Sequence, residues 1–320
     1  MQDIGEKKFI NEIVRKYITN KLNFLDDVFY VRINDVYLVL NVDGFSFSSS
    51  KYPWMDYYDI GWKAVTAGVS DLIAKNAKPL FIMVSIGLKK STLVSDGEEL
   101  LRGIRDAALY YGAEFVGGDT NSGNDEWIDI TVIGVTPNPI PLKSKDPGDY
   151  IIITGYYGIT GLAHEFFKRQ LKTKEEIIIT HTKRPKARYE LLEIFSKFRE
   201  CVKISTDVSD GLAESLYKIS YLNNVNIQLT NIPIHNYVLK ICEELELDPL
   251  ELALKGGEEF EVIFTIKPWC LDAITNKLEE LKIPFTVGKI NVLKSAGVYI
   301  GNKKLPQIVW DNFKGYTNLE

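Results

Sequence analysis

Residues 95–136 read SDGEELLRGIRDAALYYGAEFVGGDTNSGNDEWIDITVIGVT, and the succession of patterns in this stretch decides the fold class. Apolar residues first recur every three or four positions, which predicts a helix that stops at Gly112. A short strand is predicted at 114–116, and residues 127–135 alternate in the way of a half-buried strand. A helix followed by strands at this spacing predicts a mixed α/β fold.

Two helices in the first half have recognisable starting signals. Asp59 is expected to cap a helix over residues 60–75, whose apolar residues have helical spacing. Ser95 and Glu98 have the spacing of a capping box, so they are expected to start the helix of the quoted stretch.

A cluster of prolines near the middle of the chain predicts a domain boundary. Pro137, Pro139 and Pro141 are followed closely by the turn Pro147-Gly148-Asp149. We therefore expect an N-terminal α/β domain over 1–145 and a C-terminal α/β domain over 146–320. The second domain is expected to contain a strand at 150–154, helices at 159–171 and 186–199, strands at 260–266, 285–290 and 297–300, and a hairpin turn at Gly301-Asn302.

Composition excludes several classes of protein. The chain has 320 residues, with 38 Lys and Arg against 43 Asp and Glu, and this net charge of −5 does not favour a nucleic-acid partner. Its longest apolar runs fall far short of the roughly 20 residues that a membrane helix needs, so we expect a cytoplasmic protein without a membrane partner. The cysteines Cys201, Cys242 and Cys270 are widely separated, which favours incidental thiols over a disulfide framework.

Aspartates recur where apolar segments end and small residues begin. They occur in Asp26-Asp27, Asp43-Gly44, Ser70-Asp71, Gly118-Asp119 and Asp207-Val208-Ser209-Asp210-Gly211. Each motif alone has an ordinary explanation as a turn or a helix cap. Together, the carboxylates could share one cleft only if cations offset their repulsion, and Mg²⁺ prefers such oxygen ligands and shares its coordination with phosphates. The set therefore predicts a phosphate-handling magnesium site.

Other common catalytic and nucleotide-binding motifs are missing from the sequence. There is no Walker A motif, and the glycines of Gly155–Gly161 do not have the dinucleotide-binding spacing. The histidines His164, His181 and His235 are not near a serine or cysteine in a hydrolase-like context, so a catalytic triad is not expected.

Six segments in a fixed order resemble a known family. They are Asp26-Asp27, Asn41-Val42-Asp43, Gly61–Ala64 leading to Val69-Ser70-Asp71, Gly117–Thr120, Asp207–Leu212 and Gly256–Glu261. This order resembles the thiamine-monophosphate kinases. That family belongs to the PurM-like superfamily of ATP-binding proteins, with aminoimidazole ribonucleotide (AIR) synthetase, selenophosphate synthetase and the hydrogenase maturation protein HypE. The resemblance extends over nearly the whole chain.

The resemblance implies an architecture and a reaction. It implies the two-domain PurM-like (AIR synthetase-like) α/β fold and a homodimer formed through N-terminal strands. It also implies transfer of the γ-phosphoryl group of ATP directly to thiamine monophosphate, which gives thiamine diphosphate and ADP and requires Mg²⁺. Both reactants are anions, so catalysis would depend on positioning and charge neutralisation rather than on a general base.

The resemblance also implies roles for individual residues. The implied metal ligands are Asp27, Asn41, Asp43, Asp71, Asp119, Asp207 and Asp210, and Asp27, Asp71, Asp119 and Asp210 are the implied catalytic residues. The implied ATP contacts are Asn41, Val42, Gly118, Asp119, Lys143 and Ser209. The implied acceptor contacts are Ser50, Glu258 and Tyr316.

Four positions depart from the family pattern. Leu25 replaces a glycine, Val42 a hydroxyl residue, Ser50 a histidine, and Lys143 is the cation nearest to an expected arginine. Three alternatives therefore stay open beside the kinase: ATP-dependent ring closure in purine synthesis, HypE-like carbamoyl dehydration, and a nucleotide-binding paralogue without turnover. The HypE-like activity is less favoured because Asn318-Leu319-Glu320 contains no cysteine.

Overall fold

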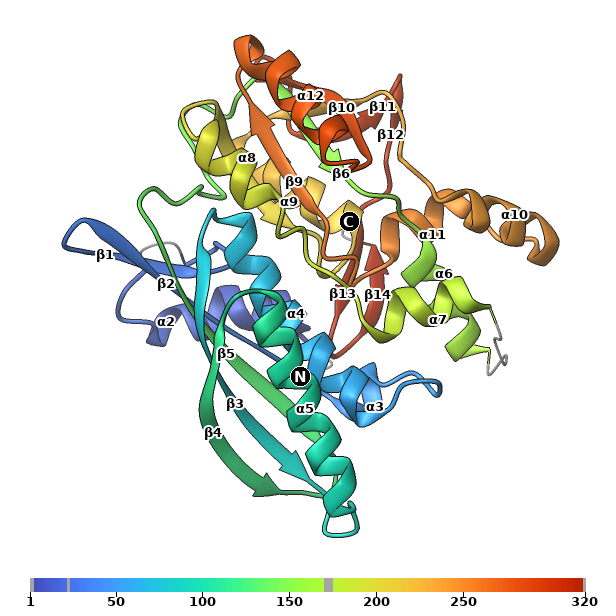
Figure 1. The fold of residues 1–320 in the computed structure, drawn as a ribbon. Coiled ribbons are helices and arrows are strands. Elements are labelled where there is room, and N and C mark those ends of the chain that lie inside the picture. Colours follow the sequence, from blue (N-terminus) through green and yellow to red (C-terminus); the bar gives the residue numbers. More distant parts are fainter. Residues whose placement is uncertain (1–2, 22–23, 170–174, 319–320) are drawn as a thin grey trace. The chain divides into compact units, whose positions relative to one another are not determined.

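The computed structural model describes residues 3–21, 24–169 and 175–318, and the chain divides into two compact units (Figure 1). The first unit contains Met1–Phe29, Ile140–Leu162 and Phe198–Glu320, and the second contains Tyr30–Pro139 and Ala163–Lys197. Each unit combines helices with a mixed sheet, which confirms the predicted α/β class. Neither unit is continuous in sequence. Met1–Phe29 belongs to the unit formed mainly by the C-terminal half, and Ala163–Lys197 belongs to the unit formed mainly by the N-terminal half.

The second unit is built on a five-stranded sheet of order β1-β2-β5-β3-β4. Strand β5 pairs antiparallel with β2 and β3, while β3 and β4 are parallel. The strands are β1 (Phe29–Ile33), β2 (Val36–Ser46), β3 (Lys78–Leu88), β4 (Glu114–Ser122) and β5 (Trp127–Thr136). The predicted strand at 127–135 is confirmed, and the one at 114–116 continues through Gly117-Gly118-Asp119.

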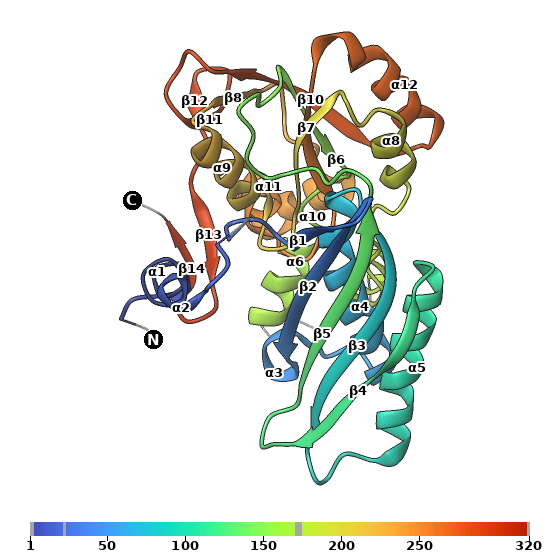
Figure 2. The same ribbon diagram turned by 90° about the vertical axis from the view of Figure 1, so that its left-hand side faces the viewer.

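Two long helices cover one face of this sheet. Helix α4 (Tyr57–Ala74) packs on β2 and β5, and α5 (Val94–Tyr110) packs on α4 and β4. Their apolar stripes supply much of the unit's buried core. Figure 2 shows the opposite face of the sheet, which no helix covers among the described residues of this unit. The unit also contains α3 (Phe47–Ser50), α7 (Glu176–Lys183) and α8 (Leu191–Lys197).

Both predicted helix starts in this unit are wrong by a few residues. Asp56 caps α4 and forms a capping box with Asp59, so the predicted cap Asp59 lies one turn inside the helix. Helix α5 begins after Leu93, whose carbonyl accepts the first helical hydrogen bonds, and Ser95 forms no cap. The predicted stop at Gly112 is confirmed by its left-handed φ of 70°.

The first unit contains a seven-stranded sheet of order β12-β11-β8-β10-β6-β9-β7 and a separate hairpin of β13 and β14. Strands β6 and β9 lie inside the sheet and are almost wholly buried. The strands are β6 (Tyr150–Thr154), β7 (Val202–Asp207), β8 (Asn226–Leu229), β9 (Val262–Ile266), β10 (Phe285–Asn291), β11 (Gly297–Ile300), β12 (Lys303–Lys304), β13 (Ile308–Asp311) and β14 (Gly315–Asn318).

Helices pack on this sheet around one hydrophobic core. Apolar residues of β6, β7 and β8 meet those of helix α9, and Leu212, Leu216 and Ile219 of this helix are fully buried. The helices that lie wholly in this unit are α1 (Glu6–Phe9), η1 (Ile10–Val14), α2 (Arg15–Tyr17), α9 (Leu212–Asn223), α10 (Asn236–Leu245), α11 (Pro249–Lys255), η2 (Pro268–Cys270) and α12 (Leu271–Glu280), whereas α6 (Ile159–Lys168) begins in this unit and continues into the second from Ala163.

Most elements predicted for the second half are present. The strand at 150–154 has the predicted bounds, and the turn at Gly301-Asn302 joins β11 to β12 as predicted. The helix predicted at 186–199 is shorter, since α8 starts only at Leu191. Helix α6 ends at Lys168, and the last two residues of its predicted span, 170 and 171, lie outside the described residues.

The expectation of unpaired thiols is wrong for two of the three cysteines. Cys201 and Cys270 form a disulfide, with their Cα atoms 6.2 Å apart, and Cys242 is buried and free. The two partners are 69 residues apart in sequence, and the pairing of β7 with β9 brings them together. Within the described part of the chain, no helix combines the length and apolarity needed to cross a bilayer.

Candidate active site

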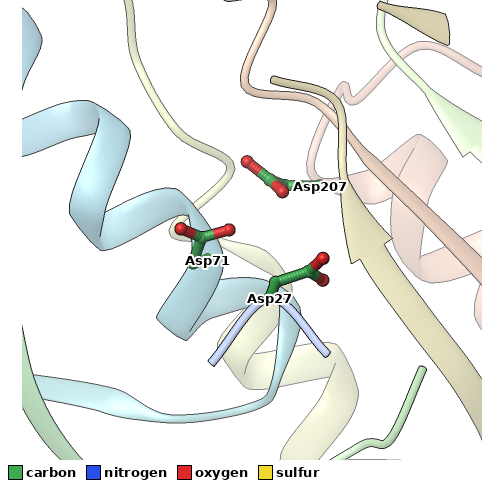
Figure 3. Close-up of side chains that lie close together, drawn as sticks. All are labelled: Asp27, Asp71 and Asp207. Carbon is green, nitrogen blue, oxygen red and sulfur yellow. The ribbon is translucent and has the colours of Figure 1, made fainter. Parts of the chain in front are cut away.

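Two carboxylates lie close together in the first unit. Asp27 precedes β1 and Asp207 ends β7, and one oxygen of each lies within 4.8 Å of the other (Figure 3). The Asp27 side chain is 6% exposed; Thr206 Oγ1 donates to its Oδ2 at 2.9 Å and Lys218 Nζ donates to its Oδ1 at 2.7 Å. Figure 3 also labels Asp71, which belongs to the second unit.

This pair fits a divalent cation. Two nearly buried carboxylates at this separation repel one another, and a hard cation bound by their oxygens would remove that cost. Asp26 beside them has a structural role, because its carboxylate accepts from the backbone N–H groups of Asp27 and Leu142, each at 3.0 Å. The loop that carries Asp27 is therefore fixed.

Two of the six segments that carry the family resemblance, Asp207–Leu212 and Gly256–Glu261, are joined by backbone hydrogen bonds. Val208 N–H donates to Glu261 O at 2.8 Å, Phe260 N–H to Val208 O at 3.1 Å, and Glu258 N–H to Ser209 O at 2.6 Å. A Cβ on Gly257 would lie 2.7 Å from Ser209 O, so only glycine allows this approach. The segments 207–211 and 256–261 thus form one rigid wall of the candidate site.

The second of these segments is strained. Glu258 and Phe260 have φ values of 60° and 51°, in the left-handed region that non-glycine residues rarely adopt. Between them, the buried carboxylate of Glu259 accepts from Gly158 N–H at 3.1 Å and Thr160 Oγ1 at 2.7 Å. Such outliers cost about 1–3 kcal/mol each and cluster at binding sites. Glu258 is therefore presented in a conformation that its surroundings enforce.

One face of helix α9 continues the site. Gly211, with φ 117°, is the N-cap, so the helix starts at Leu212, two residues after Asp210. Glu214 and Lys218 lie four residues apart within α9 and so share one face of the helix, and Asp210 directly precedes its N-cap. Glu214 forms an ion pair with Lys7 of α1, and Lys218 forms the ion pair with Asp27.

The acids at the start of α9 have shifted pKa values. Surrounding protein atoms displace water from the Asp210 carboxylate and raise its pKa, although the residue keeps an exposed surface. Desolvation, followed by the charge of Asp210, raises the pKa of Glu214 to about 7, and Lys7 opposes this effect. A carboxylate that is crowded on one side and open on the other is one that a cation from solution can reach.

Two further predicted residues of this unit lie outside this group of contacts. Tyr316 on β14 meets Trp310 edge-to-face at 4.9 Å, and Lys255 Nζ lies 5.6 Å from the Tyr316 ring centre. Lys143 is exposed in the segment that precedes β6. Tyr316 therefore packs against Trp310 and Lys255, and Lys143 is exposed to solvent.

In the second unit, β2 and α4 bring predicted metal ligands together. Asn41 Nδ2 donates to Asp71 Oδ2 at 2.5 Å and to Gly68 O at 3.4 Å. Asp43 lies two residues after Asn41, on the same face of β2. Val42 points to the opposite face and is 70% exposed, so only its backbone is available on the side of Asn41.

The glycines next to Asp119 have a packing role in β4. A Cβ on Gly118 would lie 1.8 Å from Val84 O, and Gly117 has φ 130° beside a shift in the β3–β4 register. Such a bulge needs glycine whether or not a ligand approaches. Asp119 is exposed, and its Oδ2 accepts from Asn121 Nδ2 at 2.8 Å.

Ser50 ends α3 and is held by a buried lysine. Its carbonyl accepts from Lys63 Nζ at 2.9 Å. The ammonium also lies 5.1 Å from the ring centre of Phe45 and 5.6 Å from that of Tyr52, as in cation–π contacts. Lys63 thereby fixes the segment with Ser50 to α4. Lys63 lies eight residues before Asp71 on this helix.

Sequence reasoning missed the cations Lys7, Lys63 and Lys218 and the acid Glu214. Glu214 and Lys218 lie only four and eight residues after Asp210, so a helix prediction for this stretch would have placed them together on one helix face. The partners Lys7 and Asp27 lie about 200 residues from α9 in sequence, so no local pattern could reveal these ion pairs.

Known proteins are similar to this chain over most of its length. A family model described as AIR synthase related protein, N-terminal domain, matches residues 25–136. A thiamine-monophosphate kinase of Pyrococcus horikoshii is 31% identical over 323 residues, which cover 97% of this chain and 98% of the relative.

Solved structures share the fold. One described as AaThiL complexed with AMPPCP and TMP has a TM-score of 0.83 at 24% identity and covers 98% of each chain. A HypE–HypF complex has a TM-score of 0.73 at 23% identity and covers 93% of this chain and 98% of the other. At these identities the two structures establish the architecture alone.

Proposed function

This chain belongs to the thiamine-monophosphate kinase family and has its PurM-like fold, and from that membership we propose that it phosphorylates thiamine monophosphate. The γ-phosphoryl group of ATP would pass directly to the acceptor phosphate, giving thiamine diphosphate and ADP. Similarity to kinases of this family over nearly the full length makes the chain an ATP-using protein of the superfamily; the acceptor is our proposal.

The observation that carries the proposal is the carboxylate pair of Asp27 and Asp207 beside the paired segments 207–211 and 256–261. Both segments belong to the ordered pattern of the family. The pair offers hard oxygen ligands, and the adjoining backbone holds Ser209 and Glu258 in fixed positions. The solved AaThiL structure was obtained with AMPPCP and TMP, which supports a nucleotide and an acceptor as the two ligands of this chain.

We propose that each unit supplies oxygen ligands for Mg²⁺. The proposed ligands are Asp27, Asp207 and Asp210 of the first unit and Asn41, Asp43, Asp71 and Asp119 of the second. When bound, Mg²⁺ would neutralise the phosphate oxygens and lower the repulsion between the two reactants. The chain's own task is to hold these ligands, and Thr206 and Lys218 do so for Asp27.

Nucleotide and acceptor would contact different residues. For the nucleotide we propose Ser209, Gly118 and Lys143, together with Asn41 and the backbone of Val42. For the acceptor we propose Ser50, Glu258 and Tyr316. The fixed backbones of Ser209 and Glu258, and the anchoring of Ser50 by Lys63, support positioning as the main catalytic contribution.

We further propose a homodimer formed through the open face of the five-stranded sheet. Val42, Phe81, Met83 and Val116 expose 70%, 41%, 44% and 52% of their surfaces, and alternate residues of β3 face α4 and are buried. A cluster of large apolar side chains on one sheet face is typical of a protein–protein interface. A second copy of the chain would cover it.

The reaction is tested by incubating the protein with ATP, Mg²⁺ and thiamine monophosphate and measuring thiamine diphosphate by chromatography. We expect product formation that depends on all three components. ATP binding without any product would instead support the paralogue that lacks turnover. ATP-dependent ring closure of formylglycinamidine ribonucleotide, or consumption of a carbamoylated acceptor, would support the other superfamily activities.

A further inference from the structure

We propose that Lys218 is a positioning residue that acts as a tethered counter-cation for Asp27 and Asp207. In the nucleotide-free protein its ammonium would compensate part of their charge, which weakens the binding of free divalent cations and favours uptake of the metal together with the nucleotide. The inference rests on the proposed Mg²⁺-dependent function and adds a residue and an order of binding to it.

The contacts of Asp27 support this role. Both oxygens of its carboxylate accept a hydrogen bond from the first unit, one from Thr206 Oγ1 and one from Lys218 Nζ. Thr206 is neutral and immediately precedes Asp207, so it fixes Asp27 without compensating its charge. Lys218 brings a full positive charge to within 2.7 Å of Oδ1. The ammonium thus provides a cation where two acids converge.

Burial separates this pair from an ordinary surface salt bridge. Exposed ion pairs contribute little because water screens them. Here the Asp27 side chain is 6% exposed and Asp207 is 2% exposed, while 35% of the Lys218 side chain is exposed. Both acids are withdrawn from water, whereas the lysine that pairs with Asp27 stays partly exposed to solvent. An incoming cation would therefore meet the positive charge of Lys218.

Helix α9 forms a second ion pair one turn earlier, in which the helix supplies the acid. Glu214 is paired with Lys7, and Glu214 and Lys218 lie one turn apart on one face of α9. The acids Asp27, Asp207, Asp210 and Glu214 thus have two lysines among them. This charge compensation reduces the attraction for a bare divalent cation, whereas a nucleotide brings negative charge that offsets the lysines.

The test is direct binding of Mn²⁺, with competition by Mg²⁺, to the nucleotide-free protein, followed through the electron paramagnetic resonance signal of free Mn²⁺. Lys218→Met keeps the length of the side chain and removes its charge, and Lys218→Arg keeps the charge. Lys240→Met on exposed α10 is the matched control for loss of one positive charge. Lys218→Gln, which keeps an N–H donor without charge, replaces Lys218→Met if that variant does not melt cooperatively.

We expect Lys218→Met to bind Mn²⁺ about tenfold more tightly than the parent protein, and Lys218→Arg and Lys240→Met to match the parent. A non-hydrolysable ATP analogue should strengthen Mn²⁺ binding in the parent and do so less in Lys218→Met. Adding Asp27→Asn to Lys218→Met should abolish the tenfold gain. Unchanged or weaker binding in Lys218→Met would overturn the inference.

This experiment uses neither thiamine monophosphate nor turnover. If the protein fails to make thiamine diphosphate but Lys218→Met tightens Mn²⁺ binding, the proposed reaction fails and the role of Lys218 stands. If the kinase reaction is found and Mn²⁺ binding is indifferent to Lys218, only the counter-cation role fails.

Discussion

At the scale of single residues, the acidic side chains of the first unit have different environments and therefore different tasks. The Asp26 carboxylate accepts hydrogen bonds from backbone N–H groups. The Asp27 carboxylate accepts hydrogen bonds from the side chains of Thr206 and Lys218, and it lies beside Asp207. Asp26 thus has a structural role, and its neighbour Asp27 is the proposed metal ligand. Asp210 is crowded by protein but retains exposed surface, which suits a metal ligand.

Replacing Asp210 by Asn should separate activity from stability. The variant loses a proposed anionic ligand, so we expect Mg²⁺-dependent turnover to fall about 100-fold or more. The melting temperature should stay the same or rise slightly, because desolvation already disfavours the charged form of Asp210. Turnover assays and thermal unfolding would measure both effects. Asp272→Asn on the exposed first turn of α12 is the control, and full activity of Asp210→Asn would remove Asp210 from the site.

Glu214 should make stability depend on pH. Its pKa rises from 4.5 to about 7 in the folded chain, so between these values the folded state keeps a proton that the unfolded state has lost. This contribution is complete below about pH 4.5 and is lost as the pH rises through about 7.

Glu214→Gln removes the titration. In metal-free buffer with chelator, we expect its unfolding free energy relative to the parent to increase by about 1–3 kcal/mol from pH 5 to pH 8. Urea unfolding at several pH values measures this difference. Parallel pH profiles for the two proteins would show that Glu214 does not titrate in this range.

At the scale of elements, the segment 256–261 is held against its local preferences. Backbone bonds to Val208 and Ser209 and the buried Glu259 carboxylate enforce the left-handed conformations of Glu258 and Phe260. A segment that is strained and well anchored presents its side chains rigidly. This rigidity would orient an acceptor more effectively than a mobile loop.

Two substitutions at Glu258 distinguish its charge from its backbone. Glu258→Gln keeps the conformation and removes the charge, and we expect it to raise the KM for thiamine monophosphate several-fold with little change for ATP. Glu258→Gly should raise the acceptor KM similarly while relieving about 1 kcal/mol of strain, partly offset by unfolded-state entropy. Steady-state kinetics and thermal unfolding measure these effects. An unchanged acceptor KM in both variants would exclude Glu258 from the acceptor pocket.

At the scale of the whole molecule, the second unit leaves one apolar sheet face uncovered by its own described helices. This face includes Val42, whose replacement of a hydroxyl residue is a departure from the family pattern. Because Val42 projects away from Asn41 and Asp71, its side chain would contribute to the proposed dimer rather than to the proposed metal site. With valine at position 42, the backbone of this residue can still contribute to the proposed nucleotide contact on the side of Asn41.

The dimer can be tested by placing a charge on this face. Met83→Glu would bury a carboxylate in the proposed interface, and we expect the variant to elute as a monomer where the parent is a dimer. Light scattering coupled to gel filtration gives the masses. Leu109→Glu, at a position on α5 that is 65% exposed, is the matched control and should stay dimeric. A parent protein that is monomeric at all concentrations would contradict the proposal.

The sequence by itself determined the fold class, most strands, the helix over 57–74 within a few residues, and the ordered pattern of acidic motifs. These features depend on local periodicity, on turn-forming residues and on motif order, which the sequence carries directly. The sequence placed the start of this helix a few residues late, because Asp56 and Asp59 can both cap a helix, and in the structure Asp56 is the cap and Asp59 completes the capping box.

Only the tertiary structure decided which charges meet. Lys218 reaches Asp27 across 191 residues of sequence, Lys7 reaches Glu214 across 207, and Cys201 joins Cys270 because β7 and β9 pair. Such contacts depend on the order of strands in a sheet and on the face that a helix turns inward, and neither is encoded in any short stretch of the chain. The acids could be recognised from the sequence, but their counter-cations required the fold.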